Sequence, residues 1–156
     1  MVATVGSEVQ AEAVLEAGAN HVLNYRTDDA TARVREITEG AGVDRIVEIA
    51  FGRNLALDTE VIAQLGTIAA YASDTEAEPR LPFWNLLFKN VTIRLVGSDD
   101  LPEEVNRKAA ADITACLGAG MLRPRIAQRL PLDRIADAHE AVEDNRAGGR
   151  VILDIH

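Results

Sequence analysis

Two short apolar runs in the sequence end in residues that could contact a ligand. The first, residues 45–52 (RIVEIAFG), is apolar over most of its length apart from Glu48, and the second, residues 67–72 (TIAAYA), follows one helix length later. Apolar runs bounded by turn signals are typical of strands buried on both faces of a parallel sheet. Ligands of open α/β sheets bind outside the carboxyl ends of such strands. The sequence therefore predicts a binding site at residues 51–52 and 71–73.

Other kinds of chemistry have less support in the sequence. Cys116 is the only cysteine, and the three histidines have no metal-ligand spacing, so a metal site is not expected. The formal net charge of −9 argues against nucleic acid or an anionic membrane as a partner. No apolar run approaches the ~18 residues needed to span a bilayer. A lone cysteine cannot form an internal disulfide and fits a reducing compartment, so we expect a cytoplasmic location.

The hydrophobic pattern predicts strands that alternate with helices in a single domain of 156 residues. Ser7, then Thr27 or Asp28, and Asp133 are the expected N-caps of three helices. A four-residue apolar repeat predicts an amphipathic helix over 101–117, and polar–apolar alternation marks 91–97 as an edge strand. The expected strands are 2–5, 21–25, 45–50, 67–72, 91–97 and 150–155, with an extended segment at 123–132. This order is typical of an α/β fold with a doubly wound parallel sheet, that is, a Rossmann-like fold.

The centre of this sheet is predicted to be one strand–helix–strand unit over residues 45–72. Between its two strands, an apolar helical stripe is formed by Leu55, Leu57, Val61, Ile62 and Leu65. The crossover is expected to be right-handed, as parallel crossovers almost always are.

Several stretches, in this order along the chain, resemble the medium-chain dehydrogenase/reductase superfamily. They are residues 2–7 (VATVGS), 18–25 (GANHVLNY), 43–47 (VDRIV), 83–84 (FW) with 88–92 (FKNVT), and 138–141 (AHEA) with 148–153 (GGRVIL). The branch that they resemble is that of the zinc-independent NADPH:quinone reductases. The resemblance implies NADPH as cofactor, hydride transfer to a quinone or related enone, and a homodimer formed through the strand 91–97.

The sequence also departs from the family pattern. A full-length member has an N-terminal substrate domain and a first Rossmann strand followed by a Gly-rich phosphate turn, and residues 1–156 match neither. G-x-G occurs at 40–42 and at 118–120, in both cases at an expected helix end and not after a strand. We therefore expect residues 1–156 to form a Rossmann-like domain truncated at its N-terminus. Residues 123–156 are expected to be a C-terminal extension that packs on the missing substrate domain.

The resemblance also implies which residues bind the cofactor. Gly6 and Ser7 leave room for a 2′-phosphate, which Tyr25 and Arg146 would hold, whereas Gln10 stands where the family has a lysine. The path from adenosine to nicotinamide is lined at matching positions by Ala50, Phe51, Gly52, Tyr71, Ala72 and Ser73. The nicotinamide carboxamide faces Leu95, Val96 and Gly97. Ordinary strand packing, an N-cap at Ser7 and a solvated Arg146 are the structural alternatives.

Two functions of different classes follow. One is the cofactor-binding portion of an NADPH-dependent oxidoreductase, inactive as the isolated 156-residue chain. The other is a non-catalytic, dimerising α/β module that has lost cofactor binding. A flavodoxin-like domain is disfavoured because no acidic pair follows the first strand. The sequence does not identify the acceptor.

Overall fold

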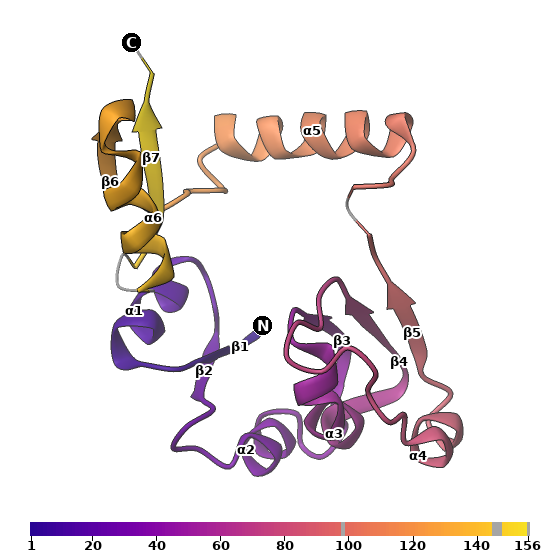
Figure 1. The fold of residues 1–156 in the computed structure, drawn as a ribbon. Coiled ribbons are helices and arrows are strands. Elements are labelled where there is room, and N and C mark those ends of the chain that lie inside the picture. The colour runs from indigo at the N-terminus through magenta and orange to yellow at the C-terminus, as the bar shows by residue number, and fades with distance from the viewer. Residues whose placement is uncertain (98, 145–147, 156) are drawn as a thin grey trace. The chain divides into compact units, whose positions relative to one another are not determined.

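The computed structural model describes residues 1–97, 99–144 and 148–155 (Figure 1). It is an α/β structure with parallel strand pairing, as the sequence predicts. In chain order the elements are β1 (Val2–Val5), α1 (Glu8–Glu16), β2 (His21–Asn24), α2 (Ala30–Ile37), β3 (Val43–Glu48), α3 (Phe51–Val61), β4 (Ile62–Ala70), α4 (Phe83–Phe88), β5 (Thr92–Leu95), α5 (Glu103–Gly118), β6 (Ile126–Pro131), a 3₁₀ turn (Leu132–Arg134), α6 (Ile135–Glu143) and β7 (Arg150–Asp154).

The chain forms two compact units, which are described separately. Unit 1 comprises Met1–Gly6 and Ala19–Pro102, and unit 2 comprises residues 7–18 with the described part of the chain from residue 103 onward. Unit 1 holds the predicted strand–helix–strand core and every predicted cofactor contact before residue 98 except Ser7.

The strands of unit 1 lie in two parallel sheets. One sheet pairs β1 with β2, and the other has the order β3-β4-β5. β5 is an edge strand, as its alternating sequence predicts. Among the described residues, β1 and β3 each have a partner on one side only, so their other edges are open. The single sheet expected from the element order is thus divided between β1 and β3.

The prediction that residues 45–52 form a strand buried on both faces was wrong. β3 spans Val43–Glu48, and Glu48 is its only buried residue, whereas the Val47 side chain is 78% exposed. The reason is that β4 covers one edge of β3 and α3 packs against one face, while the opposite edge is unpaired. Phe51 and Gly52 belong to α3 and not to the strand.

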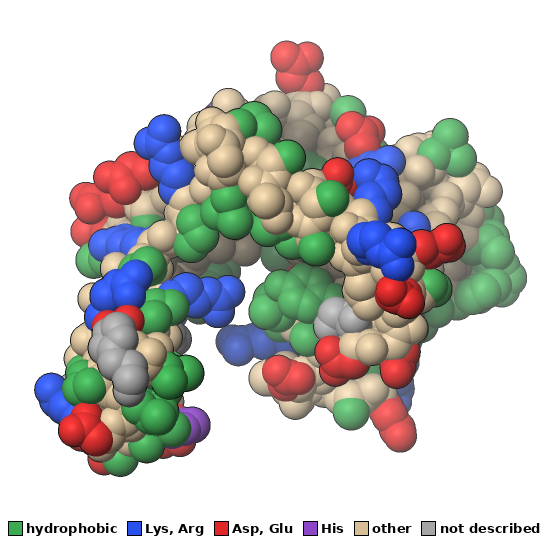
Figure 2. Space-filling model, turned by 90° about the horizontal axis from the view of Figure 1, so that it is seen from above, with side chains coloured by type: hydrophobic (Ala, Val, Ile, Leu, Met, Phe, Trp, Pro, Cys, Tyr) green, Lys and Arg blue, Asp and Glu red, His purple; other side chains and the backbone are tan. Residues whose placement is uncertain are grey.

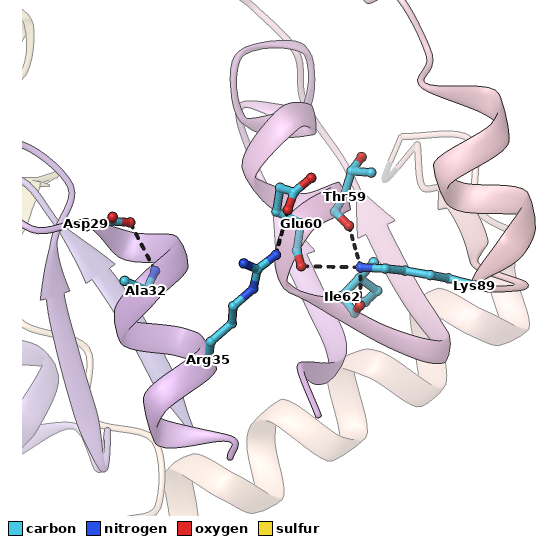
Figure 3. Close-up of polar contacts among 7 residues, drawn as sticks. All are labelled: Asp29, Ala32, Arg35, Thr59, Glu60, Ile62 and Lys89. Carbon is cyan, nitrogen blue, oxygen red and sulfur yellow. Dashed lines mark hydrogen bonds and ion pairs between the residues drawn. The ribbon is translucent and has the colours of Figure 1, made fainter. Parts of the chain in front are cut away.

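The predicted boundary between α3 and β4 was also wrong, because Ile62 and Leu65 lie in the strand. Lys89 provides the physical cause (Figure 3). Its Nζ donates to the carbonyl oxygens of Thr59 and Ile62 at 2.7 and 3.0 Å, and to that of Glu60 at 3.3 Å. These are among the last carbonyls of α3 and the first of β4, and a cation there satisfies acceptors that a helix end leaves open. The contact comes from 27–30 residues away in sequence, so local periodicity could not reveal it.

Two apolar clusters stabilise unit 1. The first is centred on the interface of α3 with β4 and α4 and contains Phe51, Leu55, Ile62, Ile68, Ala70 and Leu86. The second joins β2 and α2 to the end of α3 through Leu23, Val34 and Val61. Ala30 and Ile37 of α2 pack against this second cluster.

The helix caps confirm one prediction and correct two. Ser7 caps α1 by accepting a hydrogen bond from the Gln10 amide. α2 is capped by Asp29, which accepts from Ala32 N at 3.0 Å (Figure 3), and not by Thr27 or Asp28. The Asp28 carboxylate is engaged instead by the amide of Asn24. Asp133 does not cap α6 either, because it lies within the 3₁₀ turn and the N-cap position is Arg134.

Unit 2 contains α1, α5, α6 and the parallel pair β6–β7. α5 forms as predicted, but its apolar stripe is not buried. Val105, Ile113 and Leu117 are 42%, 51% and 44% exposed. Amphipathicity therefore predicted the helix correctly but not the burial of its apolar face.

Candidate functional site

The candidate site is the edge of unit 1 at which three parallel strands end together. Tyr71 N donates to Glu48 O at 3.1 Å, and Val96 N donates to Ala70 O at 2.9 Å, so the chain leaves β3, β4 and β5 side by side. The structure thereby brings together three predicted groups, residues 50–52, 71–73 and 95–97. Their proximity follows from the strand order β3-β4-β5 and from parallel pairing.

Hydrogen bonds join residues 50–52 to residues 71–73. Phe51 N donates to Ala72 O at 3.1 Å, Gly52 N donates to Ser73 Oγ at 2.9 Å, and Ala50 forms an isolated bridge with Ser73. Ser73 Oγ in turn donates to Glu76 O. The first amides of α3 are therefore bonded to the protein's own loop and do not form an open anion site at the helix N-terminus.

The residues of these three groups differ in how far a ligand could contact them. A Cβ at Gly52 would lie 2.5 Å from Glu76 O, so the loop requires glycine there. Phe51 is 7% exposed and belongs to the core, whereas Tyr71 is 54% exposed and Leu95 74% exposed. Gly97 has no atom within 4 Å of its ideal Cβ position, so this strand end faces open space.

Gly6 and Tyr25 form a second predicted group, at the ends of β1 and β2. Tyr25 N donates to Val5 O, and a Cβ at Gly6 would lie 2.4 Å from the phenol oxygen of Tyr25. The Tyr25 hydroxyl therefore occupies the space that a side chain at position 6 would need. The Arg26 guanidinium lies 5.9 Å from the centre of the Tyr25 ring, in a cation–π arrangement. Ser7 serves as the N-cap of α1, and Arg146 lies outside the described residues.

Two buried carboxyl groups were not among the predicted site residues, namely Glu48 at the end of β3 and Asp58 on α3. Glu48 is 7% exposed, and its carboxylate accepts from Ala50 N and from Asn54 Nδ2. Asp58 is 4% exposed, and within the described part of the chain its Oδ2 has no hydrogen-bond partner. Burial, together with the negative charge of Glu48, raises the pKa of Asp58 to about 7. The sequence does contain a signal for the burial of Asp58. This residue follows Leu55 by three positions and therefore lies on the inward-facing stripe of α3.

These carboxyl groups line a groove between β1 and β3 with a volume of about 1040 Å³. All of its lining residues belong to unit 1. Its walls include Val2, Ala3 and Thr4 of β1 and the whole of β3, and α2 and α3 contribute further apolar side chains. The groove thus coincides with the two unpaired strand edges.

The described residues contain no cluster of three or more His, Cys, Asp or Glu side chains that could hold a metal ion. None of the helices that the structure describes has the length and hydropathy needed to cross a membrane. On the face shown in Figure 2, acidic and basic side chains are interspersed.

Comparison with known proteins identifies relatives for nearly the whole chain. Residues 17–153 match the family model described as zinc-binding dehydrogenase. The chain is 30% identical over 153 residues to the quinone oxidoreductase of Lama guanicoe, covering 96% of this chain and 45% of that protein. It is 26% identical to the 2-haloacrylate reductase of a Burkholderia species, over 98% of this chain and 47% of that protein.

Solved structures share the fold of this chain. The Escherichia coli quinone oxidoreductase complexed with NADPH has a TM-score of 0.84 at 23% identity, covering 99% of this chain and 49% of that one. An NAD-dependent alcohol dehydrogenase has a TM-score of 0.83 at 27% identity, over 99% of this chain and 43% of that one. The chain thus spans about half the length of the relatives it matches. It belongs to the zinc-binding dehydrogenase family of the medium-chain dehydrogenase/reductase superfamily, within the quinone reductase branch.

Proposed function

We propose that this chain is the cofactor-binding portion of an NADPH-dependent oxidoreductase that transfers hydride to a quinone or enone-type acceptor. The observation that carries the proposal is the convergence of residues 50–52, 71–73 and 95–97 at one carboxyl edge, in a chain whose relatives are quinone oxidoreductases. Ligands of open α/β sheets bind at such edges. When bound, the nicotinamide would supply the hydride, and the protein would supply binding and orientation.

The residues at this edge fit a nicotinamide cofactor in part. Tyr71 offers an exposed aromatic face, and the open space at Gly97 admits a ligand against the backbone. Beyond this edge, at the end of β2, Tyr25 is half exposed beside Gly6, which supports a role for its hydroxyl as a donor to a phosphate. Binding of the cofactor's pyrophosphate has the least support, because the first amides of α3 are already bonded to the loop at residues 72–73.

Cofactor choice gives the direct test. If Tyr25 and Arg146 hold a 2′-phosphate, binding should favour NADPH over NADH. Replacing Arg146 by alanine should narrow this preference by about 1–3 kcal/mol, the usual scale of a hydrogen bond to a charged group. Titration followed by the fluorescence of Trp84, which is 64% exposed, measures both affinities. Arg107→Ala, which removes an exposed pair on α5, is the matched control. Equal affinity for both cofactors in the unmutated chain would contradict the assignment.

We also propose that two copies associate through β5. The strand sits at the sheet edge, and because Val96 donates to β4, the alternating backbone groups of Ile93 and Leu95 point away from it. Open edges pair readily with other strands, and a two-fold pairing satisfies both copies at once.

Leu95→Pro should therefore shift the chain from dimer to monomer, because it removes an outward N–H. Leu95→Ala keeps that N–H and should remain dimeric. Sedimentation velocity at micromolar concentration distinguishes the two states. A strictly monomeric unmutated chain would contradict this association.

A second function, a non-catalytic dimerising module that has lost cofactor binding, is favoured by one specific observation. The amides at the start of α3 are already bonded to the loop at residues 72–73. This module would dimerise through β5 but bind neither NADPH nor NADH in the fluorescence titration.

A further inference from the structure

Arg26 follows Tyr25 directly, at the carboxyl end of the sheet formed by β1 and β2. Its guanidinium carbon lies over the Tyr25 ring, 5.9 Å from the ring centre. The hydroxyl of the same ring fills the space beside Gly6, which follows β1. The two strand ends are joined, because Tyr25 N donates to Val5 O at 3.0 Å. A cation and a phenol hydroxyl therefore stand together at a carboxyl edge, where open α/β sheets bind ligands.

The turn that carries Arg26 is held by its own hydrogen bonds. Arg26 N donates to Asn24 Oδ1 at 3.0 Å, and Asn24 N donates to Asp28 Oδ2 at 2.8 Å. The amides of Thr27 and Asp28 both donate to Asn24 O. The backbone at Arg26 is therefore fixed before any ligand arrives, which lowers the entropy cost of binding through this residue.

The carboxylates nearest to Arg26 in the sequence have other partners. The two oxygens of Asp28 accept from Asn24 N and from Thr27 Oγ1, and Asp29 is the N-cap of α2. The chain has 25 acidic and only 16 basic side chains, yet no ion pair formed by the described residues involves Arg26. The charge of Arg26 thus remains available to an anion that is not part of the chain.

The residue after β1 indicates which anion suits this place. At the ribose site of dinucleotide-binding folds, an acidic side chain binds the 2′-hydroxyl of NAD, whereas a nearby arginine accommodates the 2′-phosphate of NADP. β1 is followed by Gly6, which has no side chain that could bind a ribose hydroxyl. A phosphate accepts short, charge-assisted hydrogen bonds from the planar fork of a guanidinium. The pair of Arg26 and Tyr25 beside Gly6 therefore suits a phosphate better than a ribose diol.

From these features we propose that Arg26 binds the 2′-phosphate of NADPH together with the Tyr25 hydroxyl, and so selects NADPH over NADH. Arg26 supplies the positive charge that Gln10 does not. The contact with the Tyr25 ring holds the guanidinium beside the hydroxyl with which it shares the phosphate. This role rests on the proposed function and adds to it a specificity-determining residue in unit 1.

Four nucleotides test this role on the full 156-residue chain by isothermal titration calorimetry. They are adenosine 2′,5′-bisphosphate, adenosine 3′,5′-bisphosphate, NADPH and NADH. We expect the unmutated chain to prefer the 2′,5′-bisphosphate over its isomer and NADPH over NADH. Arg26→Ala should weaken the binding of the 2′,5′-bisphosphate and of NADPH about ten- to a hundredfold, the scale of a hydrogen bond to a charged group, and that of NADH less than about threefold.

Two further variants separate phosphate binding from a structural effect. Arg33→Ala removes an exposed arginine of α2 that pairs with Glu36, so as the matched control it should leave all affinities within about threefold. Tyr25→Phe keeps the ring under the guanidinium and removes only the hydroxyl. If both groups hold one phosphate, the double variant should lose less NADPH affinity than the two single losses combined. A merely structural role of Arg26 would weaken all four ligands alike.

The other outcomes distinguish failure of this role from failure of the proposed function. If NADPH is preferred and Arg26→Ala keeps that preference, Arg26 does not bind the 2′-phosphate and the cofactor role stands. Equal binding of the two bisphosphates by the unmutated chain would mean a general phosphate site and would overturn selection by Arg26. Binding of the 2′,5′-bisphosphate that depends on Arg26, with no binding of either dinucleotide, would support the phosphate contact and exclude the cofactor role. No binding of any of the four ligands would overturn both.

Discussion

The purified 156-residue chain is expected to show no multiple-turnover oxidation of NADPH with a simple quinone. A dinucleotide pyrophosphate is normally held by the backbone amides of a Gly-rich turn and the helix behind it, and among the described residues no strand is followed by such a turn. In the structure, the amides at the start of α3 are bonded to Ala72 and Ser73 and do not replace it. Hydride transfer also needs an oriented acceptor and exclusion of water, and the candidate edge leaves Tyr71 and Leu95 exposed and Gly97 facing open space.

The measurement is the loss of NADPH absorbance over many equivalents of quinone. Sustained turnover by the unmutated chain would refute this prediction if Gly52→Trp abolished it and Gly118→Ala did not. The first substitution forces a side chain into Glu76 at the candidate site, whereas the second lies at the end of α5, where a Cβ meets no atom within 4 Å. Turnover that persists in both variants would point to a contaminating reductase.

The stability of the fold is expected to fall as pH rises from about 4 to about 7, because of Asp58. Burial and the charge of Glu48 raise the folded-state pKa of Asp58 from 3.8 to about 7. Between these values the folded chain keeps the proton and the unfolded chain releases it. The folded state therefore binds more protons, and the free energy of unfolding decreases with pH. We expect a loss on the order of 2–4 kcal/mol from this group, complete above pH 7.

Asp58→Asn should remove most of this slope. An asparagine cannot ionise, so the variant should be more stable than the unmutated chain at pH 8, and the difference should shrink toward pH 4. Urea unfolding at several pH values measures both effects, and Asp100→Asn, at an exposed carboxyl, is the control. A slope that Asp58→Asn leaves unchanged would show that the pKa of Asp58 is not raised in the folded chain.

The sequence by itself determined the order of the elements and much of the candidate site. The strand 2–5 and the Ser7 cap were predicted where the structure has them, because each depends on signals within a few residues. The meeting of residues 50–52, 71–73 and 95–97 was also predictable. Parallel strands in the order β3-β4-β5 place their carboxyl ends at one edge, whatever their side chains.

Only the tertiary structure decided the features that depend on distant partners. Lys89 sets the end of α3, and the open edge beside β3 leaves Val47 exposed although its sequence resembles a fully buried strand. The electrostatic effect of Glu48 on Asp58 and the groove that both residues line likewise come from β3 and α3 packing together. Hydrophobic periodicity records which residues favour burial. Whether another element covers them depends on contacts across the chain, and these were resolved only by the fold.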